Sequence, residues 1–250
     1  MSIVIQQGIT VQGGITIGAG APPVVLVNGS AQFTVTPTQY LSVPNSAAFT
    51  QNQPFTIECW FYPTTLNGGY VWAMLQHNFL TVTYRNSGKF VIDMSYVGNP
   101  PGYAPIGRTY PINNWYHIAL TWNGTNGWLF INGVIEATFT GAGATVADGN
   151  PFQIGQYQGQ GQSTPLGYIS NFRAVKGVAV YTAAFTVPTT NFATTQSANT
   201  NGNPSAAITA GQTQLLLNTY NGAGFLTDTS TNAFTVTNNG SVTSSTQAPF

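Results

Sequence analysis

Alternation of apolar and polar residues with a period of two limits the fold of this chain more than any other feature of its sequence. In residues 55–62, FTIECWFY, one face carries Phe55, Ile57, Cys59 and Phe61 and the other carries Thr56, Glu58, Trp60 and Tyr62. Pro63 ends the run, as proline does at the end of a strand. No window of helical length shows an apolar stripe with a 3.6-residue period. The chain is therefore predicted to be all-β.

Further strands are predicted at a spacing of about ten residues, which is typical of a sandwich or barrel. They cover residues 79–85, 89–97, 115–122, 127–133, 134–140, 152–157 and 167–175. Between them, Asn86-Ser87-Gly88, Asn123-Gly124 and Asn132-Gly133 supply residues that tolerate positive φ. These three stretches are predicted to be hairpin turns.

The pattern divides the chain into an arm and one domain. Residues 1–27 repeat Gly-Ile-Thr units and predict an extended arm for attachment or oligomer contact, or alternatively a disordered leader. Residues 28–250 form the predicted domain. Within it, the polar stretch 194–206 is predicted to be a surface loop or linker, and residues 207–250 are predicted to supply closing strands.

The low charge of the chain narrows the classes of partner. Charged residues make up 4% of the sequence, and five basic residues balance five acidic ones. With no basic field to attract phosphates, nucleic acid is not an expected partner. A net charge near zero opposes self-association weakly, so we expect a homo-oligomer. The first residues resemble neither a signal peptide nor a membrane span, because glutamine and glycine interrupt the apolar runs.

The acidic residues do not predict an enzyme. Glycoside hydrolysis normally needs two carboxyl groups about 5 to 10 Å apart. The acidic residues are Glu58, Asp93, Glu136, Asp148 and Asp228, and no two of them lie at i, i+2 or i, i+4. Glu58 with Glu136 remains a possible long-range pair. The favoured interpretation places Glu58 on a sheet face, bonded to a neighbouring tyrosine or arginine, with no catalytic residue in the chain.

The histidines and the single cysteine do not predict a metal centre. His77 and His117 have no His, Cys or carboxylate partner at metal-ligand spacing, and Cys59 is the only cysteine. His117 lies inside a predicted strand and is expected to hydrogen-bond a cross-strand neighbour. Asp148 is a weak calcium candidate, although an Asp-Gly turn explains it as well. No cofactor is expected.

Two long loops carry the residues best suited to binding. Residues 96–110 and 155–168 are rich in glycine and proline and also contain tyrosine, asparagine, glutamine and arginine. Such loops can stack rings on sugars, or they can contact another protein. The candidate ligand-binding residues are Tyr96, Asn99, Tyr103, Arg108, Gln156, Tyr157 and Gln158.

Four stretches, in order, resemble a known superfamily over residues 28–190. They are QYLSVPNSAAF, FTIECWFYP, WYHIALTWNGTNGWLFINGV and GYISNFRAVKGVAVYTAAFTVPT. Together they resemble the laminin-G-like, concanavalin A-like lectin and glucanase superfamily, a jelly-roll sandwich of two antiparallel sheets. The resemblance implies that WYHIALTW and WLFING are adjacent strands, that Trp115 and Trp122 are framework residues, and that ligands bind on the concave face or on end loops. The Glu-x-Asp-x-x-Glu pattern of the catalytic glucanases is absent.

The two ends of the sequence resemble the versions of this domain found in tailed-phage virion proteins. These ends are the Gly-Ile-Thr-rich start and FLTDTSTNAFTVTNNGSVTSSTQAPF. The resemblance implies a non-enzymatic structural protein located in the virion, a capsid decoration or a short fibre-like appendage. Its partners would be other virion proteins, reached through the arm. The alternative is a carbohydrate-binding module of tail-fibre type that recognises host surface polysaccharide. Neither interpretation involves a membrane.

Overall fold

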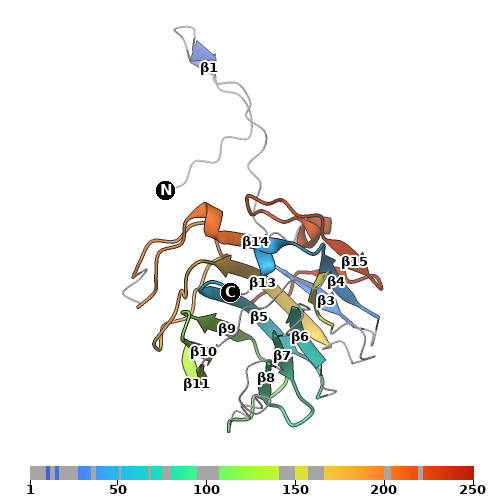
Figure 1. Ribbon diagram of the computed structural model, residues 1–250. Helices are drawn as coiled ribbons and strands as arrows, with labels where there is room; N and C mark the ends of the chain where they lie inside the picture. The colour runs from blue at the N-terminus through green and yellow to red at the C-terminus, as the bar shows by residue number, and fades with distance from the viewer. Residues whose placement is uncertain are drawn as a thin grey trace.

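The structure is a computed structural model in which all paired strands are antiparallel. It describes residues 10–11, 15–16, 28–34, 38–50, 52–66, 69–74, 80–94, 107–140, 150–156, 166–199, 204–218 and 222–250. Over these residues the chain forms two stacked sheets, with short 3₁₀ segments η1 (Ala47–Phe49), η3 (Ala210–Gln212) and η4 (Gly222–Leu226) (Figure 1). The predicted all-β sandwich is confirmed.

The larger sheet has eight strands within the described part of the chain. Its order is β11 (Val134–Thr140), β10 (Asn126–Ile131), β9 (Tyr116–Trp122), β5 (Phe55–Pro63), β13 (Gly167–Lys176), β3 (Ser30–Phe33) and β16 (Thr243–Ser245), while β14 (Thr213–Leu217) pairs with the second half of β13. β9 and β10 are neighbours, as the family resemblance implies.

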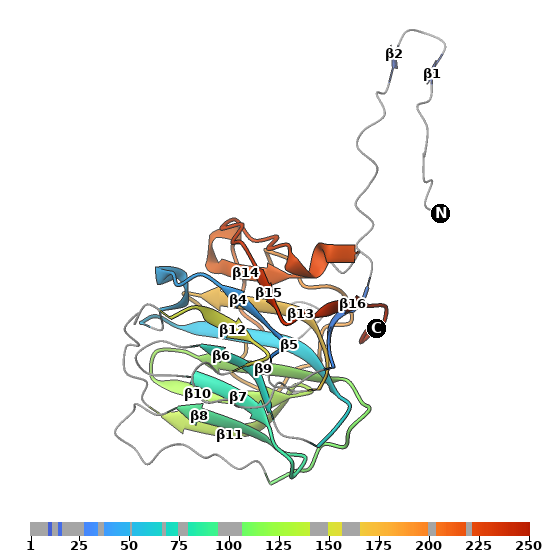
Figure 2. The same cartoon turned by 90° about the vertical axis from the view of Figure 1, so that its right-hand side faces the viewer.

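The smaller sheet has six described strands and faces the viewer in Figure 2. Its order is β15 (Thr237–Asn239), β4 (Tyr40–Val43), β12 (Phe152–Ile154), β6 (Gly69–Met74), β7 (Leu80–Tyr84) and β8 (Phe90–Met94). Near the N-terminus, β1 (Thr10–Val11) and β2 (Ile15–Thr16) pair with each other as a separate two-stranded sheet.

Local turn chemistry accounts for the hairpins. Asn132 and Gly133 join β10 to β11 with φ values of 51° and 75°, a conformation that asparagine and glycine tolerate. Before β10, the Asn123 side chain accepts hydrogen bonds from the backbone N–H groups of Thr125 and Asn126. Gly88 joins β7 to β8 with φ of 70°. All three predicted turns are confirmed.

The inner faces of the sheets meet in an aromatic and aliphatic core. The ring of Phe61 on β5 lies 5.8 Å from that of Tyr84 on β7, and the ring of Phe152 on β12 lies 5.7 Å from that of Phe172 on β13. Cys59 is fully buried between the sheets. Burial of this apolar surface is the main source of stability for such a fold.

The outer face of the eight-stranded sheet, the face turned away from the six-stranded sheet, is also largely covered. The sequence predicts this face to be the more polar one, yet every residue of β9 is buried. The cover is residues 178–192, whose Tyr181, Phe185 and Phe192 rings pack around His117 at 5.6 to 6.4 Å. Because this segment lacks strand periodicity, alternation in the sequence does not reveal it.

The end of the chain closes the sandwich. β15 pairs with β4 and β16 pairs with β3. The Asp228 carboxylate fixes the approach to these strands by accepting hydrogen bonds from the backbone N–H groups of Leu216, Ser230 and Phe234. Asn28 donates a hydrogen bond of 3.0 Å from its side chain to the carbonyl of Phe250. Residues 28 and 250 therefore lie side by side.

Within the described residues no helix is long and apolar enough to cross a membrane.

Candidate functional site

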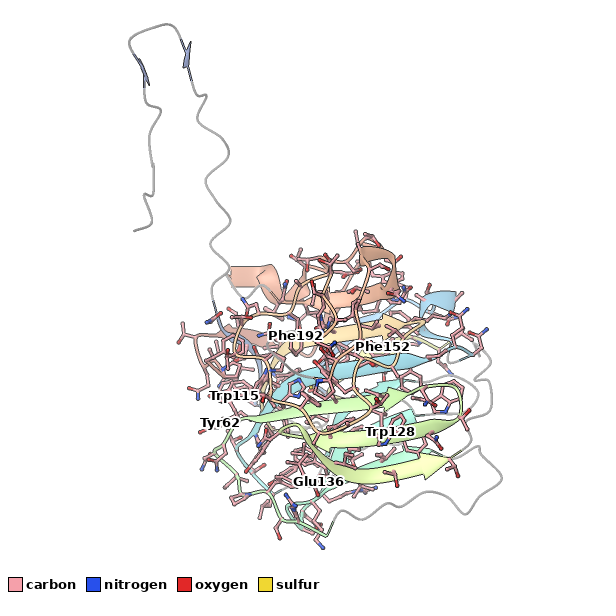
Figure 3. The ribbon with its side chains drawn as sticks, turned by 90° about the vertical axis from the view of Figure 1, so that its left-hand side faces the viewer. Tyr62, Trp115, Trp128, Glu136, Phe152 and Phe192 are labelled. Carbon is pink, nitrogen blue, oxygen red and sulfur yellow. The ribbon has the colours of Figure 1, made fainter. Side chains whose placement is uncertain are left out.

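One row of outward side chains at the margin of the eight-stranded sheet combines aromatic rings with a planar amide. Tyr62 on β5 lies opposite Tyr168 on β13, which lies opposite Gln32 on β3. Trp115 immediately precedes β9 and packs against Tyr62 (Figure 3). Gln32 donates a hydrogen bond of 3.2 Å to the Tyr168 hydroxyl. We call Trp115, Tyr62, Tyr168 and Gln32 the aromatic strip.

Neighbouring rings of the aromatic strip are steeply inclined to each other. Trp115 and Tyr62 have ring centroids 5.4 Å apart at 61°, and Tyr62 and Tyr168 are 5.7 Å apart at 72°. Such edge-to-face packing is favourable for aromatic pairs and holds the rings in place without flattening them into one plane. The strip crosses four adjacent strand positions and spans about 14 Å at the usual strand spacing.

All four residues of the aromatic strip are half-buried, and Trp115 packs against the buried cluster of Trp60, Phe192 and Leu216. In the next row inward, the ring of Trp60 packs edge-on against those of His117, at 5.2 Å, and Phe250, at 6.1 Å. That row is closed to solvent. The strip is thus the margin of a covered face, where aromatic side chains are half-buried and not fully enclosed.

Both loops singled out from the sequence end beside the aromatic strip. The backbone N–H of Thr64 donates to the carbonyl of Leu166, at the end of loop 155–168. The N–H of Asn113, which follows loop 96–110, donates to the carbonyl of Pro63. Pro63 directly follows Tyr62, so the described ends of the two loops converge on the strip.

Two of the candidate ligand-binding residues lie in the described part of the chain. Arg108 is 65% exposed at its side chain and forms an ion pair of 3.3 Å with Glu136. Gln156 is half-buried just after β12. The remaining candidates, Tyr96, Asn99, Tyr103, Tyr157 and Gln158, lie outside the described residues, as do Asp148 and His77. Their role in binding stays a prediction.

A buried polar cluster occupies the centre of the outer face. The Glu58 carboxylate accepts hydrogen bonds from Arg173, with Nε at 2.8 Å, and from the Tyr181 hydroxyl at 3.2 Å. His117 Nε2 lies 3.2 Å from the same carboxylate. The predicted contacts of Glu58 with arginine and tyrosine, and of His117 with a cross-strand neighbour, are confirmed.

Electrostatics keep Glu58 ionised. Burial by itself would raise the pKa of Glu58, but the charge of Arg173 and hydrogen bonds from His117 and Arg173 outweigh it and bring the pKa to about 2. Burial, and then the charge of Glu58, raises the pKa of the Tyr181 hydroxyl. Glu58 and His117 are both 0% exposed at their side chains, so neither of these two groups reaches solvent in this structure, and the cluster links the strands internally.

Glu58 and Glu136 do not converge. Glu58 contacts Arg173, His117 and Tyr181 on the outer face, whereas Glu136 lies beside Tyr110, a residue of the core between the sheets. Burial and then the neighbouring Glu136 raise the pKa of Tyr110. The two carboxylates therefore lie on opposite faces of the eight-stranded sheet. Among the described residues, no three His, Cys, Asp or Glu side chains are grouped to hold a metal ion.

The aromatic strip was not among the candidates drawn from the sequence. Alternation does place Tyr62 and Trp115 on the outer face, and Tyr168 closes a loop already singled out. What the sequence lacks is the register that aligns three strands far apart in the chain. Trp115, which the family resemblance treats as framework, packs against the buried cluster of Trp60, Phe192 and Leu216 and is also a half-buried member of this row.

The fold is a lectin-like β-sandwich. Two antiparallel sheets stack face to face, and a row of aromatic side chains lies on the margin of the larger sheet. The chain belongs to the concanavalin A-like lectin/glucanases superfamily, whose laminin-G-type sequence profile matches residues 35–188. No curated protein matches the sequence.

Several solved structures are similar to this chain at low sequence identity. A proposed carbohydrate binding protein from Bacteroides ovatus is 15% identical, with a TM-score of 0.57 over 88% of this chain and 60% of that one. Domains LG4-5 of the mouse laminin alpha1 chain are 12% identical, with a TM-score of 0.48 over 64% of this chain and 46% of that one. The heptameric SAP-like pentraxin of Limulus polyphemus is 18% identical, with a TM-score of 0.44 over 60% of this chain and 77% of that one.

Proposed function

We propose that this chain is a non-enzymatic, lectin-like protein that binds surface glycans through the aromatic strip. The observation that carries the proposal is the alignment of Trp115, Tyr62 and Tyr168 in one half-exposed row that ends in the amide of Gln32. Ring faces carry partial negative charge and attract the C–H bonds on the apolar face of a sugar ring. Phenol hydroxyls and the amide can exchange hydrogen bonds with sugar hydroxyls.

The chemistry of the strip favours a neutral polysaccharide. None of its four side chains is charged, and the ion pair of Arg108 with Glu136 is formed by other residues. A strip of about 14 Å accommodates more than one sugar unit, so a chain of sugars is a better ligand than a single one. Host surface polysaccharide fits this description.

A glycan array tests the proposal. We expect the protein to bind a set of host-derived glycans, and Tyr62→Ala and Trp115→Ala each to weaken binding about tenfold or more, as loss of an aromatic anchor does. Tyr40→Ala on β4, another half-buried tyrosine on a different sheet, serves as the matched control and should leave binding unchanged. Binding that survives both strip substitutions would refute the strip as the site.

The loops flanking the strip provide a second comparison. Tyr103→Ala and Tyr157→Ala test whether the loop residues predicted from the sequence contribute to the same ligand. If those two substitutions abolish binding while the strip variants bind normally, the ligand is held by the loops. If no host glycan binds the unaltered protein, glycan recognition itself is wrong.

The absence of catalysis is part of the proposal. Glu58 is enclosed and ionised, and Glu136 lies on the other face of the sheet, so the long-range acidic pair considered from the sequence does not assemble a hydrolytic site. We expect no new reducing ends when the protein is incubated with oligosaccharides that it binds. Hydrolysis that is lost in Glu136→Gln would overturn this expectation.

The setting that we infer is the virion of a tailed phage, where the chain is a capsid decoration or a short fibre-like appendage. The support is the resemblance of both ends of the sequence to phage virion proteins, together with the low charge, which suits packing in an assembly. The arm would attach the sandwich to other virion proteins, and repeated copies would present many glycan sites at once. Multivalent display strengthens weak sites.

Deletion of residues 1–27 tests the setting independently of the glycan. The described contacts of the sandwich begin at Asn28, so the truncated protein should fold, with an unchanged unfolding transition, and should fail to join particles. Retention of Tyr62-dependent glycan binding by the truncated protein would show that attachment and recognition are separable. Assembly of the truncated protein at normal occupancy would refute the role of the arm.

A further inference from the structure

A second possible ligand site lies under the segment that covers the outer face. Between this segment and β13 there is a hollow of about 410 Å³, lined by Arg173, Tyr181, residues 186–193, residues 195–197 and Ser205. Volumes of this order are typical of small-molecule sites. None of the residues of the aromatic strip lines the hollow, so it is a separate place on the molecule.

Two buried polar atoms at the hollow have no hydrogen-bond partner among the residues that the structure describes. They are the side-chain carbonyl oxygen of Asn191 and the hydroxyl of Ser205, a residue that is 6% exposed. Buried polar groups are almost always paired, because leaving one unpaired costs about 1 to 3 kcal/mol. Both residues line the same hollow, and a polar ligand there would offer each of these atoms a partner.

Arg173 adds a donor to the same hollow. A guanidinium carries five N–H bonds. Within the described residues, Nε and Nη2 donate to Glu58, Nη2 also donates to the Gln196 side chain at 3.0 Å, and Nη1 donates to the carbonyl of Ala193 at 3.0 Å. One N–H of Nη1 therefore has no partner among the described residues. The positive charge itself is already balanced by Glu58.

We propose that the hollow binds a neutral, hydroxyl-bearing molecule of monosaccharide size. A hydroxyl both donates and accepts, so adjacent hydroxyls can pair with the Asn191 amide, the Ser205 hydroxyl and the remaining N–H of Arg173. An anion suits the hollow poorly, because the Asn191 oxygen accepts hydrogen bonds and the charge of Arg173 is neutralised. Pro188 and Val187 supply apolar contact for the C–H bonds of the ligand.

Titration followed by amide NMR tests the site, with D-glucose, D-galactose, D-mannose and glycerol as probes up to about 10 mM, the range of weak single-sugar binding. We expect at least one probe to shift the amide signals of residues 186–197 and of Ser205. Ser205→Ala and Asn191→Leu should each weaken that binding about tenfold or more. Because neither atom has a partner among the described residues, neither variant should lower the unfolding temperature below that of the unaltered protein.

Matched variants separate this site from a structural effect and from the aromatic strip. Ser230→Ala removes a hydroxyl that can donate its single hydrogen either to the carbonyl of Gln214, at 3.1 Å, or to Asp228, at 2.9 Å, so it should lower stability and leave probe affinity unchanged. Tyr62→Ala should abolish polysaccharide binding and leave the probe shifts intact. The inference is overturned if no probe shifts residues 186–197, or if Ser205→Ala and Asn191→Leu bind the probe as tightly as the unaltered protein.

Discussion

Arg173 binds the Glu58 carboxylate through both Nε and Nη2, 115 residues away in sequence, under a cover that excludes solvent from both side chains. The pair joins the central strands β5 and β13 on their outer face. Tyr181, from the covering segment, and Gln196, which follows that segment, bond to the same pair. This one ionic contact therefore fastens the cover to the sheet.

Removing one member of this pair should be costly. In Glu58→Gln the Arg173 charge stays buried without a counter-charge, and we expect the free energy of unfolding to fall by about 3 to 5 kcal/mol. Urea unfolding of the two proteins measures this difference in the free energy of unfolding. The double variant Glu58→Met with Arg173→Met should lose less than Glu58→Gln alone, because no charge is then buried. If Glu58→Gln lowered the free energy of unfolding by less than about 1 kcal/mol, the Glu58–Arg173 pair would not be an important stabilising contact.

Because folding lowers the pKa of Glu58, the protein should become less stable at acidic pH. The pKa of Glu58 is lowered by folding, from 4.5 to about 2. Its contribution is therefore fully present above pH 4.5 and is lost as the pH falls toward 2, by an amount on the order of 3 kcal/mol. Urea unfolding across this range should show the decline, and Glu58→Gln should show much less of it. Equal pH dependence in the two proteins would rule out Glu58 as its source.

Asp228 anchors the closing segment of the sandwich. Its Oδ1 accepts from the N–H groups of Leu216 and Ser230, and its Oδ2 accepts from the N–H of Phe234. Asp228→Ala leaves these donors unpaired, so we expect a loss of about 2 to 4 kcal/mol and faster proteolysis after residue 230. Asp228→Asn keeps the Oδ1 acceptor and should lose less. If alanine and asparagine were equally mild, another contact would have to hold the segment.

Gly133 allows the covering segment to approach the β10–β11 turn. Its φ is 75°, and a Cβ there would lie 1.9 Å from the carbonyl oxygen of Phe185. Gly133→Ala should therefore destabilise the protein by about 2 kcal/mol or more, through backbone strain and displacement of Phe185. Gly124→Ala is the control, because its φ of 102° is strained but no atom lies within 4 Å. Equal unfolding temperatures for the two variants would show that the approach of Phe185 costs nothing.

The strands and their turns were predictable because their signals are local. Alternation marked residues 55–62 and 115–122, and Asn132-Gly133 marked a turn that requires positive φ. The same alternation placed Glu58 and His117 on one face, which was enough to predict that each would find a hydrogen-bonding neighbour.

The cover and the aromatic strip were not predictable, because both depend on contacts between distant segments. Residues 178–192 have no periodic pattern, so the sequence does not show that they bury the outer face. The strip requires the register Tyr62 to Tyr168, set by strands more than a hundred residues apart. Farther along the same pair of strands, a bulge at Asn171, with φ of 51°, shifts the register. The alternation of apolar and polar residues does not predict this bulge.

The hydrogen bond from Asn28 to Phe250 holds residues 28 and 250, at the two ends of the sandwich, next to each other. A body with its two ends together can be placed within a surface loop of another protein as a cassette, since the host chain would be interrupted without being stretched. It can equally be repeated along one polypeptide with short connections. If the sandwich binds glycans as proposed, this geometry would allow it to be moved into another protein by joining two neighbouring ends.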